Sequence, residues 1–176
     1  MASITVTLTS AAEGTPYAGV YSTVFLIPRA AVAELLERPH NASRVICRIN
    51  NAGEIYSGLM PDGEGNFFIT VNKEVCNRFD LEVGDEVSLT LSPDDSDYGM
   101  PLPAEAAELW DIDPEARDAF HTLTPGNQRN LLYQIDKLKR PESRAKKAVQ
   151  IHEYLKAVNG KLDYRELNAW IKADNR

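Results

Sequence analysis

The side chains best suited to bind a charged partner gather between Arg129 and Lys147. This stretch holds seven basic and two acidic residues, which gives it a local charge of +5. A run of bases on a helix usually forms a solvated face, so we favour that interpretation over a binding site. As a binding site, its candidate contacts to a partner or an anion are Arg129, Lys139, Arg140, Arg144, Lys146 and Lys147.

Arg144 differs from its basic neighbours because it falls in line with the apolar stripe of the helix predicted there. Its guanidinium should point toward a seam between helices and needs an acceptor, such as Glu142 or a carbonyl group near Thr124. Two interpretations follow. In the first, Arg129 and Arg144 form an anion pocket beside Thr124. In the second, Arg144 forms a buried ion pair that determines helix geometry. We favour the ion pair.

No pattern in the sequence predicts catalysis or metal binding. The histidines His40, His121 and His152 share no i,i+4 helix face with one another or with a cysteine, whereas zinc ligands usually occur in pairs. Cys76 has no local signature of a neighbouring base, and we expect it to be a buried helix cysteine. We therefore expect no catalytic residue, no cofactor and no metal, and we interpret His152 as a satisfied imidazole at the edge of a core.

Charge is distributed unevenly along the chain. Residues 1–100 hold six Lys or Arg and fourteen Asp or Glu, a net charge of −8, whereas residues 101–176 carry +1. An acidic first half repels phosphate, which disfavours nucleic acid as its partner. Cys47 and Cys76 show no disulfide spacing, the start of the chain shows no signal peptide, and no window reaches the ~18 apolar residues of a membrane span. We expect a cytoplasmic protein without membrane insertion.

The first half of the chain is predicted to form a β-sheet. Six short segments rich in β-branched and aromatic residues predict strands, with a helix over 28–38 and a second short helix after residue 71. Turn residues between the third, fourth and fifth segments predict a three-strand meander. The six segments are 3–10, 21–28, 43–50, 54–61, 66–71 and 85–91.

The second half is predicted to be helical. We expect a β-barrel domain over 1–95, an acidic Pro- and Gly-containing linker over 96–112 and a helical region over 113–176. Helices should begin at Asp113, Thr124, Arg140 and Asp163, and Asn159-Gly160 should end the third of them. Apolar stripes over 131–138 and 148–158 predict that the second and third helices pack as an antiparallel pair.

Two parts of the chain resemble known families. Residues 27–36 and 48–95 ("IPRAAVAELL" and "RINNAGEIYSGLMPDGEGNFFITVNKEVCNRFDLEVGDEVSLTLSPDD") resemble a bacterial and archaeal domain of unknown function that forms a double-split β-barrel. Cys76 departs from the basic residue expected in its short helix. Residues 120–155 ("FHTLTPGNQRNLLYQIDKLKRPESRAKKAVQIHEYL") resemble the helical region of the YdeI/OmpD-associated, bacteriocin-protection family, in which Leu-Thr-Pro, an Arg and Lys-Arg-Pro-Glu-Ser/Thr-Arg recur.

The resemblance implies an α+β fold. An N-terminal double-split β-barrel of about six strands with inserted short helices should precede a C-terminal α-helical bundle. The family name refers to protection against bacteriocins, which is a phenotype, and no catalytic residues come with it. Our first hypothesis is an uncharacterised cytosolic stress or bacteriocin-protection factor that binds an unknown protein partner through the helical region, without catalysis. One alternative is nucleic-acid binding by the basic stretch 129–147, and a second is a small ligand at the junction of barrel and helices. No oligomeric state is predicted.

Overall fold

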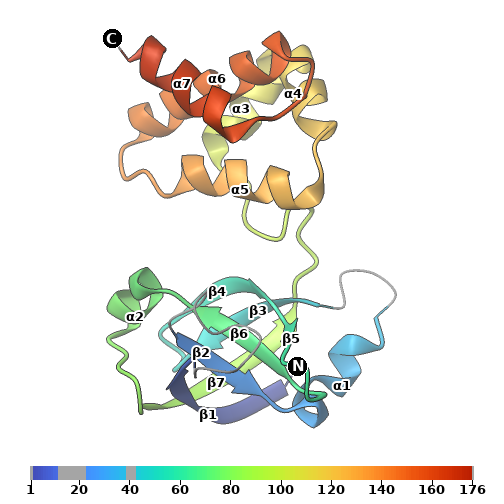
Figure 1. Cartoon of the computed structure of the whole chain (residues 1–176), viewed down its shortest axis with the longest axis vertical. Helices are drawn as coiled ribbons and strands as arrows, with labels where there is room; N and C mark the ends of the chain where they lie inside the picture. The colour runs from blue at the N-terminus through green and yellow to red at the C-terminus, as the bar shows by residue number, and fades with distance from the viewer. Residues whose placement is uncertain (1, 12–22, 39–42, 176) are drawn as a thin grey trace. The chain divides into compact units, whose positions relative to one another are not determined.

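Seven strands and two helices make up the first unit of the chain in the computed structural model, which describes residues 2–11, 23–38 and 43–175 (Figure 1). This unit covers Met1–Asp95, and a helical unit covers Ser96–Arg176. The predicted α+β class, with a sheet before a helical region, is confirmed. The strands are β1 (Ala2–Ser10), β2 (Thr23–Ile27), β3 (Arg44–Ile49), β4 (Gly53–Gly58), β5 (Met60–Pro61), β6 (Phe67–Val71) and β7 (Glu86–Pro93).

The sheet has the order β4-β3-β7-β1-β2-β6-β5, and every pairing in it is antiparallel. Strand β1 is shared, because its residues 2–7 pair with β7 and its residues 8–10 pair with β2. Strands β4 and β5 stand at opposite ends of the order, although only Leu59 separates them along the chain. The sheet therefore curls on itself into a half-barrel of seven strands, where the resemblance implied a barrel of about six (Figure 1).

One predicted strand, 54–61, is divided in two. Leu59 is 3% exposed, and its N–H donates to the carbonyl oxygen of Ser43 at 2.7 Å instead of continuing a ladder. Because of this break, β4 pairs with β3 while β5 pairs with β6. The predicted three-strand meander is therefore split between two parts of the sheet.

Alternation along the central strands builds the core of the sheet unit. Val45, Cys47 and Ile49 of β3 are fully buried, as are every second residue of β7 from Val87 to Leu91. This confirms the predicted inward face, because successive side chains of a strand point to opposite sides. Burial also raises the pKa of the Cys47 thiol to about 12, since the thiolate would lose its hydration.

Two short helices interrupt the strand order and lie at opposite ends of the sheet (Figure 1). Helix α1 (Arg29–Leu36) buries Val32 and Leu35. Helix α2 (Lys73–Phe79) begins where the side chain of Asn72 accepts the N–H of Val75. Cys76 in α2 packs against the core but is only half-buried, so it is less buried than the sequence predicted.

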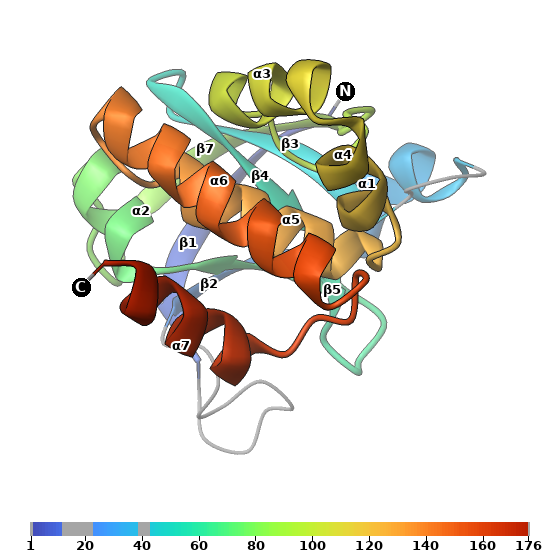
Figure 2. The ribbon, with the colours of Figure 1, turned by 90° about the horizontal axis from the view of Figure 1, so that it is seen from above.

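The helical unit is built around its longest helix, α6 (Pro141–Ala157). Helices α3 (Ala104–Ile112), α4 (Pro114–His121), α5 (Pro125–Asp136) and α7 (Tyr164–Asp174) all pack against α6. In Figure 2, α7 lies on one side of α6, and α3 and α4 lie on the other. Helices α5 and α6 pack through fully buried residues of their apolar stripes, as predicted; these are Leu131, Leu132, Ile135, Ala148, Ile151 and Leu155.

The predicted helix starts are confirmed. The side chains of Asp113, Thr124 and Asp163 each accept a backbone N–H from the first turn of α4, α5 and α7. Such a bond satisfies one of the donors that a helix start leaves unpaired. Arg140 precedes α6 without a side-chain cap, and Pro141 supplies the favourable first residue instead.

The predicted linker over 96–112 is wrong for its second half. Residues 104–112 form helix α3, in which Ala106 is 0% exposed and Trp110 is 7% exposed. Pro103 precedes the helix, and no side-chain cap marks its start. It buries only these two residues, so acidic and proline-rich composition concealed a short amphipathic pattern.

A tight turn joins α6 to α7. Asn159 and Gly160 both have positive φ, at 51° and 73°, which confirms the predicted end of α6. A Cβ atom at Gly160 would collide with the hydroxyl of Thr122 and lie 3.1 Å from the carbonyl oxygen of Ala119. The turn therefore packs closely on the connection between α4 and α5.

Candidate functional site

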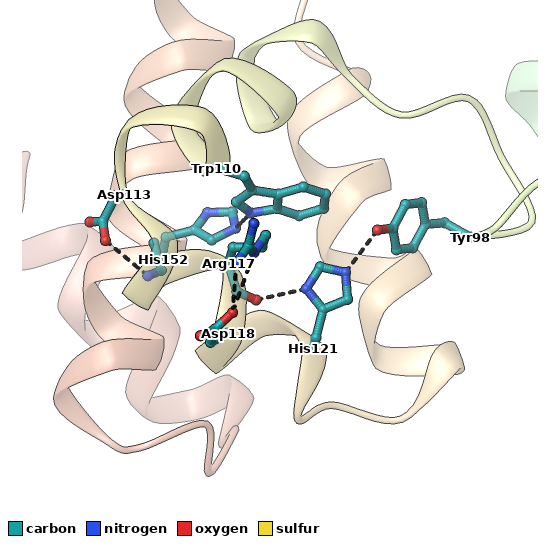
Figure 3. Close-up of polar contacts among 8 residues, drawn as sticks. Tyr98, Trp110, Asp113, Arg117, Asp118, His121 and His152 are labelled. Carbon is teal, nitrogen blue, oxygen red and sulfur yellow. Dashed lines mark hydrogen bonds and ion pairs between the residues drawn. The ribbon is translucent and has the colours of Figure 1, made fainter.

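A fully buried histidine lies at the centre of the contacts between α3, α4 and α6. Nδ1 of His152 is 2.7 Å from the carbonyl oxygen of Ala148. The indole N–H of Trp110 donates to Nε2 of His152 at 2.8 Å (Figure 3). A carbonyl can only accept and an indole N–H can only donate. His152 is therefore neutral, with its proton on Nδ1. Phe120 stacks on the imidazole at a centroid distance of 5.5 Å.

Burial lowers the pKa of His152 below its ordinary value of 6.5, because the imidazolium would lose its hydration. The bond to Ala148 and the charge of Asp113 oppose this shift, while His121 and Lys156 add to it. The predicted satisfied imidazole is confirmed, but it lies inside the core and not at its edge, since His152 is 0% exposed.

A second histidine repeats this arrangement nearer the surface. Nδ1 of His121 lies 2.7 Å from the carbonyl oxygen of Arg117, and Nε2 lies 2.8 Å from the hydroxyl of Tyr98 (Figure 3). Burial and the charge of Asp97 raise the pKa of Tyr98, so its hydroxyl keeps its proton and can donate to Nε2. The aromatic rings of Tyr98 and Trp110 are in contact, with centroids 5.8 Å apart.

An ion pair lies beside this aromatic cluster. Nζ of Lys156 is 2.7 Å from the carboxylate of Asp113 and 2.6 Å from that of Glu153. The hydrogen bonds that Lys156 donates to these carboxylates raise the pKa of Lys156, and the bond to Asp113 lowers the pKa of that carboxyl group. The contact ties the start of α4 to α6 (Figure 3).

Arg129 and Arg144 have separate partners. The Nε of Arg129 donates to the carbonyl oxygen of Tyr98 at 3.1 Å. The Nε of Arg144 donates to Glu105 at 2.7 Å, and its Nη1 donates to the carbonyl oxygen of Leu138 at 3.1 Å. Arg144 and Glu105 are 26% and 12% exposed, so this contact is the expected ion pair between helices. Its acceptor is Glu105 of α3, and neither Glu142 nor a carbonyl group near Thr124 takes that role.

The remaining bases lie at the surface where α5 passes into α6. We call Lys137, Lys139, Arg140, Lys146 and Lys147 the α5–α6 basic surface. Four of these side chains are exposed and Lys147 is half-buried. Within the described part of the chain, no ion pair involves any of the five. Burial lowers the pKa of Lys147, and the nearby charge of Lys137 lowers it further.

An exposed aromatic ring borders this surface. Tyr133 of α5 is 43% exposed, and the ammonium group of Lys137 lies 5.9 Å from the centre of its ring. An ammonium group over an aromatic ring is a favourable arrangement. The surface therefore offers positive charge next to an apolar face.

Sequence reasoning missed the residues that hold segment 96–112 in place, namely Tyr98, Glu105 and Trp110. Their partners lie 23, 39 and 42 residues away along the chain, so no local spacing indicates them. The available signal was composition, because two large aromatic side chains are unusual in a solvated linker.

The sheet unit carries two ion pairs at the end of β7. Arg38 contacts Asp95, and Arg44 lies 3.6 Å from Asp94.

Among the described residues, no cluster of three or more His, Cys, Asp or Glu side chains could hold a metal ion. His40 lies outside the described residues. No helix in the described ranges combines the length and apolar composition needed to cross a membrane.

The chain is thus an α+β protein in which a curled antiparallel sheet precedes a helical unit with an exposed basic surface. Residues 100–157 match the family model described as bacteriocin-protection, YdeI or OmpD-associated. Residues 12–91 match a domain of unknown function, DUF1905. Both resemblances seen in the sequence are confirmed. No curated protein and no solved structure gives a significant match to the chain.

Proposed function

We propose that this chain is a cytoplasmic bacteriocin-protection or stress factor that acts by binding another protein, and that it is not an enzyme. The partner contact is the α5–α6 basic surface, which lies inside the region that matches the bacteriocin-protection family. This surface includes the predicted contacts Lys139, Arg140, Lys146 and Lys147.

One observation carries the proposal. Glu105 neutralises Arg144, yet the five bases of the surface have no ion pair among the described residues. An exposed cation without a partner contributes little to folding, whereas it contributes strongly to the attraction of a negatively charged partner. With Glu105 counted, the stretch 129–147 still carries a net charge of +4.

The chemistry of the surface indicates the kind of partner. Lysine ammonium groups are compact point charges that do not require the planar geometry of a bidentate contact. The exposed ring of Tyr133 adds an apolar contact of the type that is enriched at protein interfaces. An acidic segment of a protein with an apolar side chain nearby fits both features.

The test is a charge-reversal experiment on the full chain. Lys139→Glu combined with Lys146→Glu should abolish capture of the partner from a bacterial lysate. Lys161→Glu combined with Lys172→Glu changes the net charge equally on exposed residues outside the surface and should keep the partner. A Lys139/Lys146 variant that captures the same proteins as the wild type contradicts the proposal, as does a wild type that captures only chaperones.

The same lack of ion pairs favours nucleic acid as the second candidate partner. The logarithm of the binding constant would then fall linearly with the logarithm of the salt concentration. Loss of one phosphate contact would reduce the slope of this line by about 1. A gel-shift titration at low salt decides between the two candidates. Absence of any shift removes the nucleic-acid alternative and leaves the protein partner.

A further inference from the structure

Two histidines of the helical unit use the same hydrogen-bonding arrangement. In each, Nδ1 bonds to the backbone carbonyl four residues earlier, which is Ala148 for His152 and Arg117 for His121. Nε2 of each ring then meets an aromatic side chain, which is the indole N–H of Trp110 for His152 and the hydroxyl of Tyr98 for His121 (Figure 3). Both histidines thus carry a proton on Nδ1, and the indole donor further requires that Nε2 of His152 is unprotonated.

Both aromatic donors belong to one segment, residues 96–112. Tyr98 stands near its start and Trp110 near its end. The segment follows directly on Asp95, where the sheet unit ends. The two histidines therefore hold the segment that leads from the sheet unit into α4.

The two contacts respond differently to a proton. A proton on Nε2 of His152 would face the indole N–H of Trp110, which cannot accept a hydrogen bond. A proton on Nε2 of His121 would face a hydroxyl group, which can rotate and accept it. Protonation is incompatible with the contact to Trp110 and compatible with the contact to Tyr98.

We propose that His152 and His121 form a clasp on segment 96–112 in which only the contact of His152 is sensitive to acid. Protonation of His152 releases the C-terminal half of α3 from α6, while Tyr98 stays attached to His121. This device goes beyond partner binding and does not depend on the α5–α6 basic surface.

The charged groups around His152 act on its pKa in both directions. Asp113 at the start of α4 favours the imidazolium, while Lys156 of α6 and His121 of α4 oppose it. Trp110 of α3 and Phe120 of α4 pack on the ring without charge. The ion pair of Glu105 and Arg144 contains no histidine, so the start of α3 stays attached while its end is released.

The test is hydrogen exchange on the full chain, corrected for the intrinsic effect of pH. The amides of residues 109–112 should exchange about tenfold faster for each pH unit below 6.5, the ordinary value for histidine, while the amides of α5 keep their rate. His152→Gln should remove this pH dependence, because glutamine does not titrate in this range. His121→Gln is the matched control and should retain it.

Two results would overturn the clasp. One is an exchange rate in residues 109–112 that does not change with pH, or changes equally in α5. The other is the same pH profile in His152→Gln as in the wild type. If His152→Gln does not fold, Trp110→Phe replaces it and should make the profile shallower, because the opposing donor is gone. Imidazole nitrogen NMR of the wild type at pH 7.5 gives a direct check, and a proton on Nε2 of His152 also contradicts the clasp.

Discussion

Replacing Arg144 with methionine should lower the free energy of unfolding by about 2–3 kcal/mol. The substitution keeps most of the apolar stem but removes the charged bond to Glu105 at 2.7 Å and the bond to the carbonyl oxygen of Leu138 at 3.1 Å. A hydrogen bond to a charged group contributes about 1.5–3 kcal/mol. Removal of the arginine also leaves the carboxylate of Glu105 without a compensating charge. For a unit of this size, each kcal/mol lowers the melting temperature by roughly 4–8 °C.

The assay is urea unfolding of the wild type, Arg144→Met, Glu105→Gln and the double variant. The four free energies form a cycle that isolates the interaction between the two side chains, and we expect a coupling of about 1–2 kcal/mol. Lys146→Met removes an exposed charge two residues away and should change stability by no more than about 0.5 kcal/mol. A coupling near zero, or an Arg144→Met variant as stable as this control, would refute the ion-pair interpretation.

Three further predictions concern the turn, the cysteines and pH. Gly160→Ala should destabilise the chain by about 1 kcal/mol or more in urea unfolding, because the φ of 73° strains an alanine and its Cβ has no room. The control Gly126→Ala, at an open helix position, should be neutral or stabilising by up to about 1 kcal/mol. Equal effects of the two substitutions would contradict the close packing. Alkylation of the native protein at pH 8, followed by mass spectrometry, should modify the half-buried Cys76 before Cys47, whose burial raises the thiol pKa to about 12; preferential labelling of Cys47 would contradict its placement. The pKa of His152 is lowered on folding, so its contribution to stability is complete above pH 6.5 and is lost as the pH falls, by at most about 1.4 kcal/mol per pH unit. In the same urea assay, His152→Gln should lose less stability between pH 7 and 5 than the wild type. An equal loss in the two proteins would contradict this assignment.

Local signals determined most of the secondary structure. A cap such as Asp113 or Thr124 acts within four residues, so its sequence is enough to predict the helix that follows. Alternation in β3 likewise acts along one strand, and the predicted inward face of Val45, Cys47 and Ile49 is the face that the core buries.

Pairing and division of strands depended on the whole sheet. The residues 54–61 read as one strand, and nothing within them indicates that the chain turns inward at Leu59. That break follows from the bond between Leu59 and Ser43, which lies 16 residues earlier, and from burial of the leucine side chain. The sheet has to curl, and the division of this strand allows both halves to find partners.

The sequence by itself determined the two-part α+β organisation, the starts of α4, α5, α6 and α7 and the location of the basic stretch, because each depends on neighbours along the chain. Only the tertiary structure decided which bases stay exposed and which are engaged. The stripe predicted that Arg144 needs an acceptor, but the acceptor is Glu105, 39 residues earlier, just as the partner of His152 is Trp110, 42 residues earlier. Such contacts arise when separate helices pack around one core, and packing selects partners by distance in space.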